Sequence, residues 1–139
     1  MTTINVIEQQ ISSIREYLKI LKDCRKYSRS QIENENIVRG AIERFLYLLS
    51  QEVIHTAEAI ISFKKFRRPD TYAEAFRILN EENFISLDLS LRLIEVAKFR
   101  NIIAHDYKKI NYDTVYDILH NGLKDVEAFL KEINKSLDL

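Results

Sequence analysis

The sequence predicts an all-α protein, an up-and-down helical bundle of four longer helices and one short helix. Two observations support this prediction. The 139 residues include only two glycines and one proline, so the chain has almost none of the turn residues that closely spaced strands require. Apolar residues also recur at steps of three and four over long stretches, which places them on one face of a helix. Amphipathic helices joined by short connections pack as a bundle.

The first two predicted helices lie within residues 4–63. The first begins near Ile4 and ends within residues 24–28. Its apolar positions form one stripe: Ile4, Ile7, Ile11, Ile14, Leu18 and Leu21. A longer pattern opens within residues 32–37 and runs to about Phe63. At roughly 1.5 Å per residue this helix could span about 40 Å, and we expect it to be the spine of the fold.

The later helices begin at residues suited to capping. Pro69 disfavours helix in the residue before it, and Asp70 or Thr71 can cap a short third helix. Ser86 is the expected cap of a fourth helix, which runs through Ala104.

A polar segment separates the fourth helix from the last one. Residues 106–113, DYKKINYD, interrupt the apolar spacing, which resumes at Val115 and continues to Ile133. A final helix is therefore expected over residues 115–133.

The bulk properties fit one compact domain over residues 1–139. Apolar residues make up 46% and charged residues 30%, so the chain can bury a core. Basic and acidic residues number 21 each, so no overall field attracts nucleic acid or an anionic membrane. Neither DNA nor a membrane is an expected partner, and any polyanion must meet a local patch. No apolar run approaches the roughly 18 residues of a membrane-spanning helix, and the N-terminus does not resemble an export signal.

Several kinds of site are excluded by the motifs that are missing. No glycine-rich loop is available to cradle phosphates. His55 lies in HTAE rather than HExxH, and we expect both it and His120 to be structural residues. Cys24 is the only cysteine, which rules out an internal disulfide and fits a reducing, cytoplasmic setting. We therefore expect no metal and no cofactor.

The residues that can carry chemistry gather in FRNIIAHDYKKIN, where the fourth helix pattern ends. On a regular helix, Arg100 and His105 lie about 140° apart around the axis. For both to serve one site, the helix must bend or end near Ala104, or a second subunit must complete the site.

Arginine and histidine suit the cleavage of a phosphodiester whose own 2′-hydroxyl is the nucleophile. Histidine, with an ordinary pKa of about 6.5, exchanges protons at neutral pH, and the arginine fork can hold the phosphate. A full acid–base mechanism needs two proton carriers, which a two-fold dimer with both His105 side chains in one cleft would supply. The same residue types also act as a simple cap at a helix C-terminus. Residue chemistry alone leaves both interpretations open.

Arg100, four residues, His105, one residue, Tyr107 resembles the RxxxxHxY signature of HepT-like HEPN proteins. The similarity extends over nearly the whole chain. Arg39 and Arg44 resemble the paired arginines of the family's second long helix. Segments 71–86 and 111–130 resemble its later portions.

The resemblance implies the HEPN fold and a homodimer that cleaves RNA at the subunit interface without a metal. It makes Arg100 and His105 catalytic, and Asn101 and Asp106 supporting residues. It also implies an antitoxin, an MntA-type nucleotidyltransferase that transfers AMP from ATP to Tyr107. A nucleotide attached there adds bulk and negative charge where the RNA phosphate must lie, so activity should fall sharply.

Other basic and aromatic residues have less specific expectations. Lys108 and Lys109 lie next to the motif and could contact phosphate. Arg39 and Arg44 could bind RNA or form ion pairs within the bundle or the dimer. The basic run at residues 64–68 is expected to be a solvated turn. Four tyrosines are expected in the core or an interface. They are Tyr47, Tyr72, Tyr112 and Tyr116.

Two alternatives belong to other functional classes. The bundle could be a non-catalytic partner that binds substrate for a minimal nucleotidyltransferase. It could also be a plain helical interaction module in which the motif caps a helix. Growth arrest that depends on His105 would favour the toxin over both.

Overall fold

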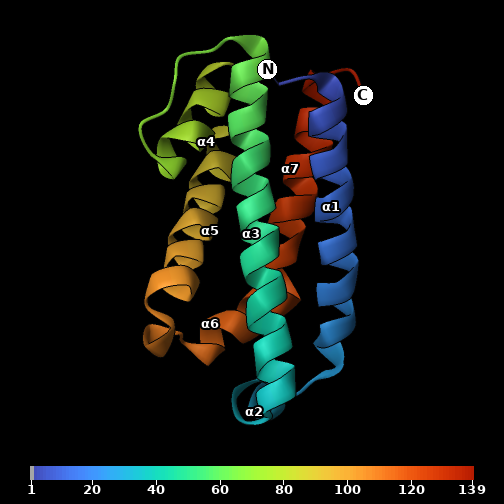
Figure 1. Cartoon of the computed structure of the whole chain (residues 1–139), viewed down its shortest axis with the longest axis vertical. Coiled ribbons are helices and arrows are strands. Elements are labelled where there is room, and N and C mark those ends of the chain that lie inside the picture. Colours follow the sequence, from blue (N-terminus) through green and yellow to red (C-terminus); the bar gives the residue numbers. More distant parts are fainter. Residues whose placement is uncertain (1) are drawn as a thin grey trace.

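The structure is a computed structural model that describes residues 2–139, and within that range the chain forms helices and no strand. The elements, shown in Figure 1, are α1 (Ile4–Asp23), η1 (Cys24–Lys26), α2 (Arg29–Asn34), α3 (Asn36–Lys64), α4 (Tyr72–Glu81), α5 (Leu87–His105), η2 (Tyr107–Lys109), α6 (Tyr112–Asp117), η3 (Ile118–Gly122) and α7 (Leu123–Ser136).

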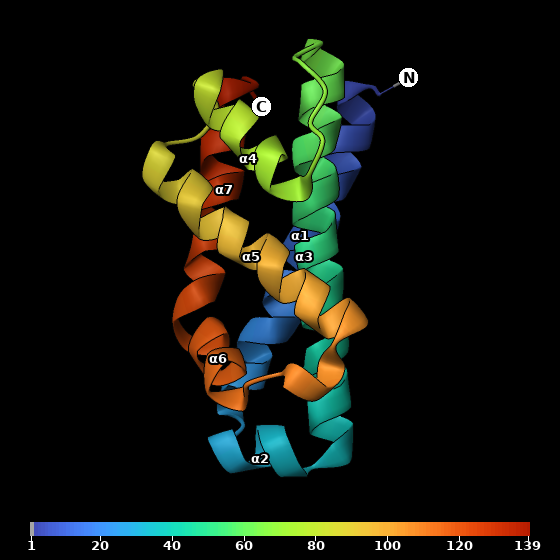
Figure 2. The same ribbon diagram turned by 90° about the vertical axis from the view of Figure 1, so that its left-hand side faces the viewer.

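The long helices alternate in direction, as the sequence predicts. In Figure 1, α1 descends, α3 rises, α5 descends and α7 rises, and both ends of the chain lie at the top. The central helix α3 packs against α1, α4 and α5. Figure 2 shows that α5 crosses the bundle obliquely, in front of α3. The predicted up-and-down bundle is confirmed.

The second predicted helix is divided into two. Ser28 caps α2 through a capping box, in which its hydroxyl accepts from the Gln31 N–H and the Gln31 side chain accepts from the Ser28 N–H. The backbone at Glu35 is then extended, and α3 begins at Asn36. The sequence does not predict α2 as a separate helix, because its capping box starts a helix before the main apolar stripe begins.

Hydroxyl side chains cap the first turns of α4 and α5. Thr71, rather than Asp70, caps α4, since its hydroxyl accepts from the Glu74 N–H at 3.0 Å. Ser86 caps α5 in the same way, as predicted, and α5 ends at His105.

The last helical stretch starts earlier than predicted and is not uniform. Asn111 caps α6, which begins at Tyr112 and leads directly into a π-helical turn, η3, and then α7. The apolar spacing cannot reveal an Asn cap ahead of the first buried residue, Val115.

The core contains apolar side chains from α1, α2, α3, α4, α5, α6 and α7. At its centre the rings of Phe76 and Phe129 meet edge to face, with their centroids 6.3 Å apart. Buried hydroxyls are satisfied within α3, where Ser50 donates to the Leu46 carbonyl at 2.8 Å. Among residues 2–139, no helix is both long and apolar enough to cross a membrane.

One helix departs from the usual division between a buried and an exposed face. α5 buries Leu89, Leu93, Ile94 and Ala97. It also exposes Leu87 (62%), Leu91 (55%) and Ile102 (37%) to solvent. The motif segment therefore begins in the last turns of a helix that carries apolar side chains on its outer side.

Candidate active site

The guanidinium of Arg100 is held in a fixed orientation at the interface of α5 and α3. Its Nε and Nη2 both donate to Oε1 of Gln51, at 3.1 and 2.8 Å. Its Nη1 donates to Oδ1 of Asn101 at 3.0 Å. Because three N–H groups have defined acceptors, the planar group has little freedom to rotate.

Two aromatic rings border the same guanidinium. The carbon atom of the Arg100 guanidinium lies 5.4 Å from the ring centre of Tyr47 and 5.3 Å from that of Tyr72. Both distances are within cation–π range. Arg44 approaches the Tyr47 ring as well, at 5.8 Å. The structure thus brings Arg44 and Arg100 to one aromatic ring and concentrates positive charge at a local patch.

His105 is the last residue of α5, and its side chain is exposed. The predicted helix end near Ala104 is found one residue later. Because α5 continues through His105, the 3.6-residue period still separates Arg100 and His105 by about 140°. One copy of the chain therefore does not direct these two side chains toward the same point.

His105 lies on the same side of α5 as the exposed apolar residues. His105 comes about five helical turns after Leu87, so the two share a face. Leu91 and Ile102 lie within about 60° of that face at 100° per residue. We call these four residues the α5 outer face. It joins the motif histidine to exposed apolar surface.

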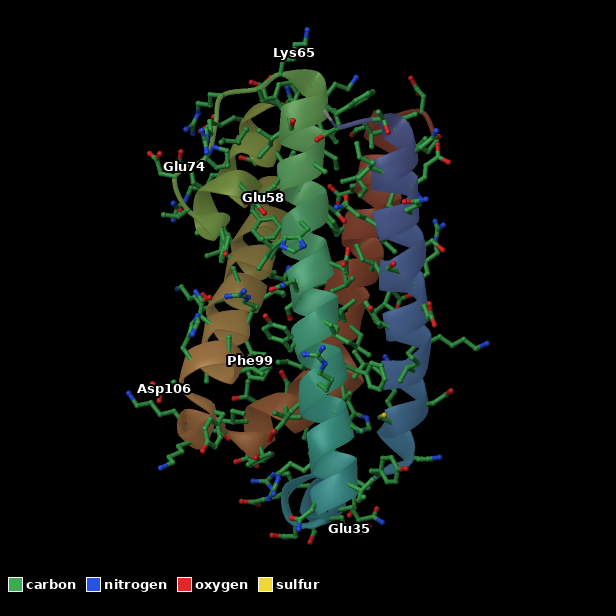
Figure 3. The ribbon with its side chains drawn as sticks, in the orientation of Figure 1. Glu35, Glu58, Lys65, Glu74, Phe99 and Asp106 are labelled. Carbon is green, nitrogen blue, oxygen red and sulfur yellow. The ribbon has the colours of Figure 1, made fainter. Side chains whose placement is uncertain are left out.

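The residues after His105 form a short, exposed turn. The Asp106 N–H donates to the Ile102 carbonyl at 2.9 Å and ends the helix, while its carboxylate pairs with Lys109 at 3.1 Å. Figure 3 shows Asp106 at the lower, outer end of α5. Tyr107 is 66% exposed, and Lys108 is exposed as well. An enzyme or a polyanion can reach this turn.

Arg39 lies away from Arg100 and Arg44. It donates to the Glu33 carbonyl at 3.1 Å and to Oδ1 of Asn36 at 3.0 Å, which ties α2 to the start of α3. The two arginines that resemble a family pair thus have different surroundings. Arg44 is near Arg100, and Arg39 stabilises the junction of two helices.

The basic run at residues 64–68 forms a turn, as predicted. Lys65 takes the left-handed conformation at the end of α3, with φ of 59°. Arg67 is paired with two carboxylates, Glu74 at 2.7 Å and Glu81 at 2.9 Å. This arrangement anchors the loop before α4.

Gln51, Tyr47 and Tyr72 are site residues that the sequence did not identify as such. The sequence predicts Tyr47 and Tyr72 only as core or interface residues, yet both rings border the Arg100 guanidinium. A signal was available on α3, where Arg44, Tyr47 and Gln51 have the three- and four-residue spacing of one helix face. Nothing in the local sequence indicates that this face meets Arg100.

Tyr112 is structural, as predicted. Its hydroxyl donates to Oε1 of Glu43 at 2.8 Å, and burial together with this carboxylate raises the pKa of Tyr112 to about 12. The phenol stays neutral and fastens α6 to α3.

The chain is similar to known proteins over nearly its whole length. A family model described as "Ribonuclease HepT-like" matches residues 7–133. The mRNA nuclease HepT of Shewanella oneidensis is 25% identical over 93% of this chain and 96% of its own length. The tRNA nuclease HepT of Aphanizomenon flos-aquae is 26% identical over 95% and 90%, respectively.

A solved structure of a similar protein has the same fold. A tri-AMPylated HEPN toxin of Shewanella oneidensis, in complex with an MNT antitoxin, superposes with a TM-score of 0.86. That toxin is 25% identical, and the match covers 94% of this chain and 97% of the toxin.

Proposed function

Because this chain belongs to the ribonuclease HepT-like family, we propose that it is an endoribonuclease and the toxin of a toxin–antitoxin pair. Its antitoxin is an MntA-type nucleotidyltransferase, a proposal supported by the similar Shewanella toxin, which is tri-AMPylated and in complex with an MNT antitoxin. The observation that supports this function best is the fixed guanidinium of Arg100 on the helix that ends in the exposed His105. We place the reaction in the cytoplasm, where RNA and ATP are available.

The proposed reaction is transesterification within the RNA. The 2′-oxygen attacks the adjacent phosphorus, the P–O5′ bond breaks, and the products are a 2′,3′-cyclic phosphate and a 5′-hydroxyl. One His105 accepts the proton of the 2′-hydroxyl, and His105 of the partner subunit protonates the leaving 5′-oxygen. Arg100 holds the non-bridging oxygens as charge develops on them, with Asn101 fixing its Nη1. These steps require no metal.

Two adjacent lysines can assist binding of the RNA backbone. Lys108 is exposed, and Lys109 reaches solvent although it pairs with Asp106. Arg44 adds a third cation near Arg100 through their shared ring, Tyr47. We assign these three residues to phosphate contacts and leave Arg39 as a structural residue.

A direct assay tests the function. The purified protein is incubated with single-stranded RNA in excess EDTA, and the product ends are identified by mass spectrometry. Cyclic phosphate ends formed at the same rate with and without EDTA are expected. Absence of cleavage, or 5′-phosphate products, would contradict the proposal.

The proposed dimer uses the α5 outer face, because it combines exposed apolar side chains with the single motif histidine of each chain. A groove of about 350 Å³ beside it is lined by apolar side chains such as Phe99, Ile102 and Ile118. A two-fold axis near the end of α5 would bring both His105 side chains into one cleft, and the side chain of Arg100, which lies about 140° around α5 from His105, would reach the phosphate from the rim of that cleft.

Leu91→Asp is expected to dissociate this dimer and to reduce cleavage by at least about tenfold, since a carboxylate would be buried without a partner. Light scattering after size exclusion measures the oligomer, and the RNA assay measures activity. Val6→Asp is the matched control, because Val6 is an exposed apolar residue on α1. A dimeric, fully active Leu91→Asp protein would exclude the α5 outer face.

Gln51→Leu tests the orientation of Arg100. Gln51 is a positioning residue that accepts two hydrogen bonds from the guanidinium, and such bonds to a charged group contribute about 1.5–3 kcal/mol each. We expect kcat to fall by about tenfold or more while KM changes less, because the arginine is still present but misdirected. Gln9→Leu, at an exposed position on α1, is the control. An unchanged kcat would show that Gln51 does not position Arg100.

A further inference from the structure

A pocket of about 460 Å³ lies next to the Arg100 site and has no role in the reaction described above. Its lining comes from α3, from the loop that precedes α4, from the start of α4 and from α5, and it includes Glu58, Asp70, Tyr72, Lys98 and Asn101. Two of these residues also contact Arg100. Asn101 accepts its hydrogen bond, and Tyr72 borders its guanidinium. The pocket is therefore adjacent to Arg100, the residue proposed to hold the phosphate.

The charge of the lining disfavours a phosphate. Glu58 and Asp70 carry carboxylates, which repel an anion and accept hydrogen bonds from N–H groups. No hydrogen bond or ion pair to the Glu58 carboxylate occurs within the described chain, residues 2–139. Figure 3 shows Glu58 on the side of α3 that faces α4. This carboxylate is free to accept from a ligand that enters the pocket.

The other lining groups fit a flat ring with both donors and an acceptor. Tyr72 is 37% exposed, so its phenol ring is available for stacking. The Oδ1 of Asn101 is already used by Arg100, which leaves the Nδ2 group to donate. Lys98, although it pairs with Glu95 at 3.1 Å, supplies a second donor at the pocket.

Among the RNA bases, guanine matches this set most completely. Its N1–H and N2–H groups lie side by side and can donate to both oxygens of one carboxylate, and its O6 accepts from an amide or ammonium group. On the same Watson–Crick edge, uracil offers a single N–H donor, and adenine and cytosine offer only an exocyclic amine. A base bound in this pocket would belong to a nucleotide adjacent to the phosphate bound by Arg100.

We propose that this pocket binds a guanine base of the RNA substrate next to the scissile phosphate, with Glu58 as the residue that selects it. The inference rests on the proposed function, because it takes RNA as the substrate. It assigns the protein a base preference in addition to its chemistry. Bases read by hydrogen bonds and aromatic stacking in single strands are the common mode of sequence-specific RNA recognition.

The test measures binding, so it does not depend on cleavage. Fluorescein-labelled uridine heptamers, methylated at every 2′-oxygen so that they cannot be cleaved, carry one guanine or one inosine at each position in turn. Inosine lacks only the N2 amine. At one position we expect inosine to raise the Kd, measured by fluorescence anisotropy, by about tenfold relative to guanine, the range of one bidentate contact.

Protein variants then locate the selectivity. In Glu58→Gln the amide nitrogen would face an N–H of the base, so the guanine-over-inosine ratio should fall to about one. Glu16→Gln, at an exposed position on α1, should retain the ratio. Circular dichroism confirms that each variant is folded.

The possible outcomes are distinct. Equal binding of guanine and inosine at every position, or an unchanged ratio in folded Glu58→Gln, would overturn the inference. Selective guanine binding that Glu58→Gln removes supports it. If that selectivity is present but unmethylated RNA is never cleaved, the proposed function fails while the guanine pocket stands.

Discussion

His105→Ala should reduce RNA cleavage by about 10²–10⁴-fold, the usual contribution of a general acid or base. Each chain brings one motif histidine, and in the proposed dimer the substitution removes both proton carriers at once. The His105 side chain is exposed at the end of α5, so its loss should leave the bundle folded. Rates are measured on a fluorogenic RNA, with light scattering as the check that the dimer persists.

The matched control for this prediction is His55→Ala. His55 is also an exposed histidine on a long helix, and it lies on α3 outside the motif. Its loss should change the rate by less than about twofold. Equal cleavage by the His105→Ala protein and the wild type would exclude the acid–base role, and a melted His105→Ala protein would favour a helix cap instead.

Local signals predict most of the helices. Apolar spacing identifies the long ones because each buries a continuous stripe, and Ser86 identifies the start of α5 because its hydroxyl satisfies the Leu89 N–H. The extra helix α2 is missed because its capping box, with Ser28 and Gln31, precedes the apolar stripe. The π-helical turn η3 is missed because it does not alter the residue types that the core requires.

The site is only partly predictable, for a different reason. The separation of Arg100 and His105 follows from helix geometry and needs no structure. The partners of Arg100 lie far away in sequence. Gln51 and Tyr47 are on α3 and Tyr72 begins α4, so only the packing of α5 against these helices brings them together. The same holds for the pocket at Glu58 and for the exposure of Leu91.

Transfer of AMP to Tyr107 by the cognate nucleotidyltransferase should reduce cleavage by about 100-fold or more. Tyr107 is 66% exposed and follows His105 by two residues, so an enzyme can reach it and its product lies beside the catalytic histidine. The phenolic oxygen attacks the α-phosphorus of ATP, pyrophosphate leaves, and the phenol proton is released. The new phosphate is a fixed anion where the RNA phosphate must bind, and juxtaposed like charges cost several kcal/mol.

Co-expression with and without an active antitoxin tests this prediction, with intact mass to count AMP units and the RNA assay to measure activity. Tyr107→Phe should remain unmodified and keep cleaving in the presence of the antitoxin and ATP, because it lacks the oxygen that attacks. Tyr116→Phe is the matched control, since Tyr116 is also an exposed tyrosine and lies on α6. That variant should be modified and inhibited like the wild type. Inhibition of Tyr107→Phe to the same extent, with AMP on another residue, would show that Tyr107 is not the point of control.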